Sequence, residues 1–170
     1  MTSTSPIGGA VNGGTLVDAL GTGFIAGPRL YCRFGAVYVV PVHISNVLIR
    51  CVAPAHAGFV VVDVTNNGHE FSNSGVQYTY IPNLQLVSRV PNHGPFTGGT
   101  VVTIQGLNFV NWVSLTCQFD GVPTQATFIS ATELRCTAPS RPGPILGVLS
   151  VAANAQDFAA PALDFDYRAL

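Results

Sequence analysis

Apolar and polar residues alternate over short stretches along most of the chain, and this period of two is typical of half-buried β-strands. Val, Thr, Phe and Tyr recur in these stretches, and such side chains fit a pleated sheet. Gly and Pro separate the stretches, as expected of strands joined by tight turns. In the first half of the chain the alternation predicts strands at roughly 15–20, 30–34, 36–42, 47–52, 59–65 and 70–80. The pattern predicts an all-β protein with almost no helix.

One turn is marked by its residues. Asn66-Asn67-Gly68 lies between the alternating segment 62–65 and Glu70-Phe71. Because Asn and Gly tolerate the positive φ values of a type I′ turn, this segment predicts a tight β-hairpin. The equivalent residues in the second half are Asn154-Ala155, which lack the glycine.

The second half of the chain repeats the first. A shift of 85 brings many identical residues into register without a gap, among them Gly13-Gly14-Thr15 with Gly98-Gly99-Thr100, Phe24 with Phe109, and Cys32 with Cys117. Beyond Ala53-Pro54 a shift of 87 restores the match, so the second copy has two extra residues, which we place within 141–147.

A repeat this long, filled with strand signals, indicates duplication of a whole small domain and not a solenoid. Small β-sandwiches need roughly 100 residues or fewer, so the chain has room for two. Tyr80 still belongs to the last strand pattern of the first copy, and Leu84 already opens the second. We therefore predict two tandem β-sandwiches, at residues 1–81 and 82–170.

Each copy contains two cysteines at the same spacing, and the alternation turns all four toward the core. Four cysteines allow three pairings; the duplication favours Cys32 with Cys51 and Cys117 with Cys136, because each copy must fold with its own pair. Disulfides of this kind indicate an oxidising compartment. The alternative is a set of reduced core cysteines. Zinc or redox sites usually need closely spaced cysteine pairs, which the chain lacks.

Composition adds one unusual property, a low charge. Charged residues make up 9% of the chain and the net charge is -1, whereas roughly 25% of residues are charged in an average domain. Without a basic surface, nucleic-acid binding is not expected. No apolar run approaches the roughly 20 residues that span a bilayer, so direct membrane insertion is not expected. Residues 1–6 lack a basic start and an apolar segment, so we expect no signal peptide within this sequence.

The surface is predicted to carry no N-linked glycans and few charges. No Asn-x-Ser/Thr sequon occurs, so N-glycans would not shield it. Exposed neutral and apolar surface commonly marks contact with other proteins. We therefore expect protein partners or neighbouring copies of the chain in a larger assembly.

No pattern of catalytic or metal-binding residues stands out. The chain lacks a Gly-x-Ser-x-Gly elbow, a phosphate-binding loop and a His-Glu-x-x-His motif. Its histidines and carboxylates are scattered, without metal-ligand spacing. We predict no catalytic residue, no metal and no cofactor, and hence no enzyme. Trp112, the sole tryptophan, falls in a loop of the second copy, as a candidate partner contact or as a cap over the sandwich.

Several motifs recur in both copies: Gly-Gly-Thr-x-Val, Gly-x-x-Phe, Cys-x-Phe and Arg-Cys-x-Ala-Pro. Together with Asn66-Asn67-Gly68 and the Tyr-x-Tyr at 78–80, they resemble the IPT/TIG domain, the immunoglobulin-like fold of plexins, related receptor ectodomains and some transcription factors. The resemblance covers nearly the whole chain, twice. It implies an all-β fold of two tandem immunoglobulin-like β-sandwiches, and the cysteine pair resembles that of the extracellular members.

The resemblance implies a spacer, adhesion or docking role and brings no catalytic residue. We expect a non-catalytic structural or protein-binding module, extracellular or at the cell surface through the secretory route, in a receptor ectodomain, adhesin, filament or coat. An alternative is a carbohydrate-associated accessory domain, which needs aligned exposed aromatic side chains; the candidates are Trp112, Tyr38 and Tyr31. A third is a transcription-factor-type dimerisation domain, which the cysteines and the charge both oppose.

Overall fold

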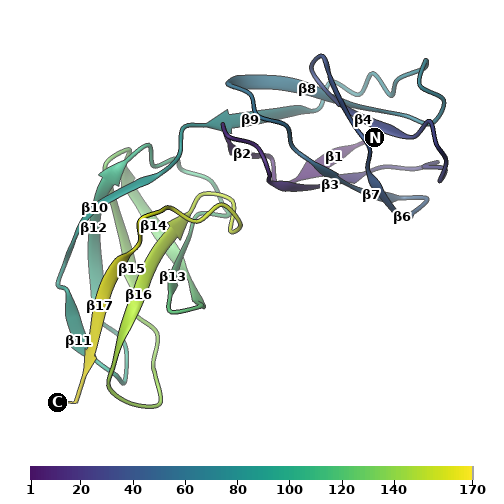
Figure 1. The fold of residues 1–170 in the computed structure, drawn as a ribbon. Coiled ribbons are helices and arrows are strands. Elements are labelled where there is room, and N and C mark those ends of the chain that lie inside the picture. The colour runs from purple at the N-terminus through teal and green to yellow at the C-terminus, as the bar shows by residue number, and fades with distance from the viewer. Residues whose placement is uncertain (170) are drawn as a thin grey trace. The chain divides into compact units, whose positions relative to one another are not determined.

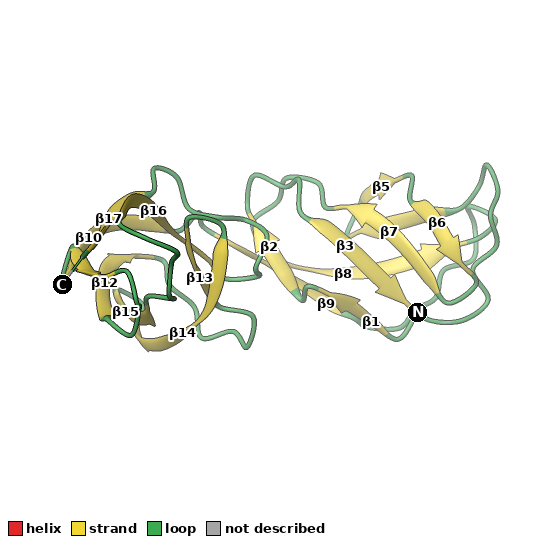
Figure 2. Cartoon of the chain, turned by 90° about the horizontal axis from the view of Figure 1, so that it is seen from below, coloured by secondary structure: helices red, strands yellow, loops and turns green. Residues whose placement is uncertain are grey.

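The computed structural model describes residues 1–169, in which β-strands are joined by loops and no helix occurs (Figure 2). Contacts divide the chain into two compact units, Met1–Pro82 (unit 1) and Asn83–Leu170 (unit 2). Each unit is a β-sandwich, so the predicted all-β class is confirmed. The expected boundary between residues 81 and 82 stays a prediction, and the observed division lies one residue later. No helix among the described residues is long and apolar enough to cross a membrane.

Unit 1 consists of two sheets (Figure 1). The four-stranded sheet contains, in spatial order, β1 (Ser3–Ser5), β3 (Leu16–Leu20), β7 (Leu48–Val52) and β6 (Val42–Ser45). The five-stranded sheet contains, in spatial order, β2 (Gly8–Ala10), β9 (Gln77–Ile81), β8 (Gly58–Thr65), β4 (Tyr31–Phe34) and β5 (Val37–Val39). Paired strands are antiparallel except β2 and β9, which are parallel. The inner faces of both sheets supply one hydrophobic core.

Unit 2 repeats this plan with its eight strands in one continuous order. They are β10 (Gln85–Val90), β12 (Val101–Leu107), β15 (Glu133–Thr137), β14 (Val122–Ser130), β13 (Thr116–Phe119), β16 (Ile145–Ala152), β17 (Leu163–Arg168) and β11 (His93–Pro95). Residues 122–125 of β14 pair with β13, and its later residues pair with β15. Strand β14 thus passes from one layer of the sandwich to the other without interruption.

The duplication extends to the packing of the two cores. In unit 1 the ring of Phe34 meets Tyr78 edge-on at 5.5 Å between centroids, and in unit 2 Phe119 meets Phe165 at 5.4 Å. All four residues are almost fully buried. Edge-to-face pairs add about 0.5–1.5 kcal/mol beyond the burial of their area. Equivalent aromatic pairs therefore pack in the core of both units.

The Gly-Gly-Thr motif has a structural reason in both units. Gly13 and Gly98 have φ values of 74° and 82°, and a Cβ atom on either would lie within about 3 Å of backbone atoms of the Ala-Pro motif. The following glycine donates its N–H to the carbonyl of Ala53 in unit 1 and of Ala138 in unit 2, at 2.8 and 2.9 Å. The two motifs recur together because their backbones are in contact.

The units differ where the chain passes between sheets. In unit 2 the N–H of Ala126 donates to the carbonyl of Leu115 at 3.2 Å, and Nε2 of Gln125 donates to the same oxygen at 3.0 Å. The equivalent residues in unit 1 are Val40 and Pro41. These offer neither donor, because proline has no N–H and valine no side-chain amide. The single strand of unit 2 is therefore broken into β5 and β6 in unit 1.

Some predicted strands differ from the observed ones. The strand predicted at 36–42 is wrong, because the break at Pro41 divides it between two sheets. The strand predicted at 70–80 is wrong in its first half, since β9 begins at Gln77. Strands β1 and β2 were not predicted, because their Ser, Thr and Gly residues show no apolar alternation.

The hairpin predicted at 66–68 is also wrong. The Oγ1 atom of Thr65 accepts a hydrogen bond from the N–H of Gly68 at 2.9 Å, and Oδ1 of Asn67 accepts from the N–H groups of His69 and Glu70, both at 2.9 Å. Side-chain oxygens thus take up the backbone donors in place of a cross-strand ladder. The chain continues as a loop over residues 66–76.

Substitution of Ala126 tests the cause of the strand break. We expect Ala126→Pro to destabilise unit 2 by about 1 kcal/mol or more, since it removes a backbone hydrogen bond within a strand. Trp112 lies in unit 2 and is the sole tryptophan, so its fluorescence during urea unfolding reports this unit. Ala126→Ser keeps the N–H and is the control. Equal unfolding midpoints for the proline variant and the wild type would contradict the explanation.

Candidate functional site

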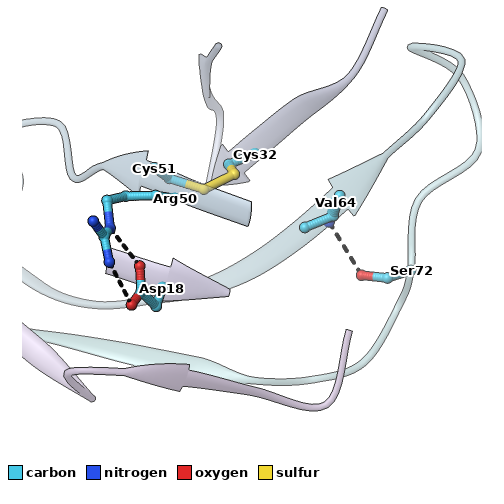
Figure 3. Close-up of a disulfide and its surroundings, with 6 residues drawn as sticks. All are labelled: Asp18, Cys32, Arg50, Cys51, Val64 and Ser72. Atoms are coloured by element: carbon cyan, nitrogen blue, oxygen red, sulfur yellow. Dashed lines mark hydrogen bonds and ion pairs between the residues drawn. A yellow bond between two sulfur atoms is a disulfide. The ribbon is translucent and has the colours of Figure 1, made fainter. Parts of the chain in front are cut away.

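A disulfide joins the two layers of each sandwich. In unit 1, Cys32 on β4 is bonded to Cys51 on β7, with their Cα atoms 6.4 Å apart (Figure 3). In unit 2, Cys117 on β13 is bonded to Cys136 on β15, at a Cα separation of 6.3 Å. Both separations lie within the usual range of about 4.4–6.8 Å. All four side chains are buried, so each disulfide is part of the core between the sheets.

A second fixed arrangement lies on the outer face of the five-stranded sheet of unit 1. Arg33 on β4 is paired in register with Asp63 on β8, and Nη2 of Arg33 donates to Oδ2 of Asp63 at 2.8 Å. The hydroxyl of Ser72 and the N–H of Ser74 donate to the other carboxylate oxygen at 3.1 and 3.3 Å. Asp63 is only 3% exposed. One buried carboxylate therefore holds the loop 66–76 against the sheet.

Aromatic side chains surround this ion pair. The guanidinium carbon of Arg33 lies 3.8 Å from the centre of the Phe71 ring. Tyr38 meets Phe71 edge-on at 5.8 Å, and Tyr31 meets Tyr38 edge-on at 6.2 Å. The cluster is specific to unit 1, because the residues of unit 2 at positions 31, 33 and 38 of the repeat are Thr116, Gln118 and Pro123.

The environment of Asp63 shifts its ionisation. Burial raises the pKa of its carboxyl, but hydrogen bonds from Arg33, Ser72 and Ser74, with the positive charge of Arg33, outweigh burial and leave the pKa below its ordinary value. The equivalent residue in unit 2 is Ser150, whose hydroxyl donates to the carbonyl of Ala159 at 2.8 Å. The second unit holds its equivalent loop with an uncharged group.

A hollow of about 320 Å³ lies between loops of unit 1, at residues 22–24 and 66–72. Asn66 connects these loops: its Nδ2 donates to the carbonyl of Gly23 at 2.8 Å, and its Oδ1 accepts from the N–H of Ile25 at 3.1 Å. Glu70 supplies the one carboxylate of the lining and accepts a hydrogen bond from Asn67. A single carboxylate does not make a set of metal ligands.

Trp112 lies in the loop between β12 and β13 and is half-buried. The backbone N–H of Trp112 donates to the carbonyl of Val110, and the backbone carbonyl of Trp112 accepts from the N–H of Leu115, both at 3.0 Å. The next residue, Val113, is 92% exposed. The Trp112 ring is thus neither fully open nor fully covered, and its role as a partner contact stays a prediction.

The histidines make separate local contacts. His43 Nε2 lies 3.2 Å from the carbonyl oxygen of Phe24, and His93 Nδ1 lies 2.9 Å from Oδ1 of Asn92. Within residues 1–169, no three His, Cys, Asp or Glu side chains are grouped closely enough to hold a metal ion.

The sequence pattern singled out the cysteines and made Tyr31 and Tyr38 candidate exposed aromatic residues, but the pairing of Arg33 with Asp63 was missed. The sequence did contain a signal for this ion pair, because Arg33 and Asp63 each alternate with apolar residues on a predicted strand, and opposite charges on neighbouring strands can pair. The contact of Phe71 with Arg33 could not be predicted from the sequence, since the position of Phe71 depends on the irregular path of the loop 66–76.

Comparison with known proteins identifies the domains. The IPT/TIG domain family matches residues 1–80 and again 84–167. Plexin-2 of Caenorhabditis elegans is 25% identical over 144 residues, which is 79% of this chain. Plexin-A4 of Mus musculus is 38% identical over 85 residues, or 50% of this chain. These matches cover only 8% and 4% of the two relatives, so the chain corresponds to a small part of either.

Solved structures show the same fold. Two structures of the full extracellular region of Plexin A4 superpose on this chain with TM-scores of 0.53 and 0.61. They cover 98% and 99% of this chain, at 22% and 20% identity, and the matched parts are 18% and 15% of those chains.

The lowered pKa of Asp63 predicts how the stability of unit 1 depends on pH. Above the ordinary aspartate pKa of about 3.9, Asp63 is charged in the folded and unfolded states, and its full contribution to stability is present. As the pH falls below about 4, the unfolded state takes up the proton first, so the contribution declines toward the folded-state pKa. We expect Asp63→Asn to destabilise unit 1 at pH 7 and less so at pH 3.

Urea titrations followed by NMR resolve the two units and measure this difference. Ser150→Ala, at the equivalent uncharged position of unit 2, is the control and should show no such pH dependence. A difference between Asp63→Asn and wild type that is constant from pH 7 to pH 3 would exclude the carboxylate as its cause.

The matched segments span nearly all of the described residues, and each has the two-sheet sandwich and its own disulfide between the sheets. The chain therefore belongs to the IPT/TIG domain family, as two tandem immunoglobulin-like domains.

Proposed function

We propose that this chain is a non-catalytic module of an extracellular receptor-type protein, in which its two IPT/TIG domains serve as structural and protein-binding units. The observation that carries the proposal is the duplicated disulfide: each unit has one, buried between its sheets. Such disulfides persist in oxidising compartments and are rare where thiols are kept reduced.

The relatives support the same compartment. Two of the solved structures that resemble the chain are extracellular regions of a plexin. The arginines on the strands also support a structural role, because several are engaged within the domain and not directed at a ligand. These ion pairs are Arg33 with Asp63, Arg50 with Asp18, Arg89 with Asp164, and Arg168 with Asp166.

A glycan-binding role is the second candidate, because Tyr31, Tyr38 and Phe71 gather on one face of unit 1. Exposed aromatic rings stack on sugars, and Tyr38 is 51% exposed. The rings meet edge-on, and Arg33 covers one face of Phe71, which favours protein contact over stacking. A glycan array with no binding above that of a Tyr38→Ala variant would remove this candidate.

Disulfide mapping of the native protein tests the proposed function. Protein recovered from its natural source under thiol-blocking conditions is digested and analysed by non-reducing mass spectrometry. We expect peptides that link Cys32 to Cys51 and Cys117 to Cys136, with no blocked cysteine, and antibody labelling at the surface of intact cells. Four blocked thiols together with labelling only after permeabilisation would contradict an extracellular module.

A further inference from the structure

One arginine of the chain differs from all the others in its surroundings. The sequence contains no lysine, and Lys and Arg together number 7, so all seven are arginines. Six of them form ion pairs with an aspartate or a glutamate, and these are Arg33, Arg50, Arg89, Arg135, Arg141 and Arg168. Arg29 is exposed, and within residues 1–169 it is the one arginine without such a partner.

The backbone at Arg29 is also unlike that at the other arginines. Arg141 precedes Pro142, whose ring nitrogen has no N–H. Arg29 lies in the loop between β3 and β4, outside any strand. The remaining five lie inside strands, namely Arg33 on β4, Arg50 on β7, Arg89 on β10, Arg135 on β15 and Arg168 on β17.

The loop is open over the residues that lead to Arg29. Residues 25–29 are all exposed, and Ile25 is 64% exposed. The N–H of Ile25 donates to Oδ1 of Asn66 at 3.1 Å and anchors the start of this run. The N–H groups of Ala26, Gly27 and Arg29 make no hydrogen bond among residues 1–169. Exposed loops of this kind are the preferred sites of proteolytic cutting.

The peptide bond after Arg29 lies at the end of the open run. Leu30 is 3% exposed, and its N–H donates to the carbonyl of Gly27 at 3.2 Å. The hydroxyl of Tyr31 donates to the carbonyl of Pro28 at 3.3 Å. A protease that binds this bond must draw Leu30 out of the core, which breaks these two hydrogen bonds but no strand pairing. Such local opening requires less free energy than unfolding of the whole sandwich.

Unit 2 shows that the fold does not require an arginine in this loop. The residue of unit 2 equivalent to Arg29 is Ser114. Its hydroxyl donates to the carbonyl of Ala153 at 2.9 Å, so it helps to hold unit 2 together. Arg29 has no comparable contact in unit 1, and folding alone does not explain its presence.

A free guanidinium before an accessible peptide bond is what an arginine-specific serine protease recognises. A carboxylate in the specificity pocket of such an enzyme binds the guanidinium, and residues 19–31 contain no acidic side chain to oppose it. The enzyme's serine oxygen attacks the carbonyl carbon of Arg29, the C–N bond to Leu30 breaks, and the enzyme's histidine protonates the leaving nitrogen. One water molecule then hydrolyses the acyl-enzyme and leaves Arg29 with a free carboxylate.

The disulfide of unit 1 does not bridge this bond. Cys32 and Cys51 both follow Arg29, so a cut leaves residues 1–29 without a covalent link to the rest. That segment contains β1, β2 and β3, and β3 stays paired with β7. Its residues Val17 and Ala19 are fully buried. The cut chain is therefore held together by strand pairing and core packing alone.

We propose that the bond between Arg29 and Leu30 is a processing site, at which an arginine-specific serine protease cuts the folded chain and turns unit 1 into a complex of two segments. The inference goes beyond the proposed function, because it assigns a covalent change to unit 1 and leaves unit 2 intact.

Limited digestion of the folded, oxidised chain with trypsin tests the site. The products are analysed by mass spectrometry without reduction. We expect the first products to be residues 1–29 and 30–170, separable without a reducing agent. A cut after Arg33, Arg50 or Arg135 would lie between two bonded cysteines, and its products would stay linked until they are reduced.

Three variants separate the role of Arg29 from that of the loop. Arg29→Gln should slow the first cut by about a hundredfold or more, because the carboxylate of the protease pocket loses its partner. Arg135→Gln removes an exposed arginine from a strand and should be cut as the wild type is. The double variant Arg29→Gln, Ala26→Arg moves the arginine within the exposed run and should be cut between positions 26 and 27.

Gel filtration of the cut chain tests the complex of two segments. We expect residues 1–29 to elute with residues 30–170 in the absence of urea. The short segment should leave at a urea concentration at which the fluorescence of Trp112 still reports a folded unit 2.

Two results would overturn the processing site: a first cut at any other bond, or a wild type that survives trypsin as long as Arg29→Gln does. Loss of residues 1–29 from the cut chain without urea would overturn the complex of two segments. None of these results bears on the disulfides and cell-surface location, by which the proposed function is judged.

Discussion

The covalent link between the two sheets is the constraint on which the rest of each sandwich depends. A domain of this size buries too little apolar surface for a wide margin of stability, and its strands are short. The disulfide joins the two layers within the core, which also contains the edge-to-face pair of Phe34 and Tyr78. With the layers held at fixed separation, the outer faces of the sheets are free to vary. The two copies have in fact varied there while keeping an equivalent disulfide and aromatic pair in the core.

That division between interior and surface explains how the copies differ. Phe34 and Phe119 keep equivalent partners in the two cores, whereas the position beneath the covering loop is Asp63 in unit 1 and Ser150 in unit 2. The outer face of β3 and β7 in unit 1 is mainly apolar around the ion pair of Asp18 with Arg50, and the same positions of unit 2 are mainly polar. One fold with two surfaces suits a module whose copies contact different neighbours, because specificity resides in the surface and not in the fold.

Sequence reasoning succeeded where a residue's role follows from period and duplication. The inward cysteines and the Gly-Gly-Thr motif are of this kind, because both copies repeat them. It failed where the backbone departs from regular strands. Pro41 is itself a signal against a continuous strand, but only comparison with Ala126 explains why the chain breaks there. Asn67 and Gly68 suggested a hairpin, while the competing hydrogen bonds of Thr65 decided the outcome. The outer side chains of β3 and β7 were visible in the sequence only as alternation, since the pairing of Asp18 with Arg50 requires the strand register.

The most direct test of the account is hydrogen exchange of the native chain, unit by unit, with and without full reduction of the disulfides. Closing a loop of about 20 residues contributes roughly 3 kcal/mol in the chain-entropy model. The account predicts that reduction weakens protection in both sandwiches by a similar amount of this order, with the strands that carry the cysteines affected together with the rest of each core. Unchanged protection in both units after complete reduction would contradict it.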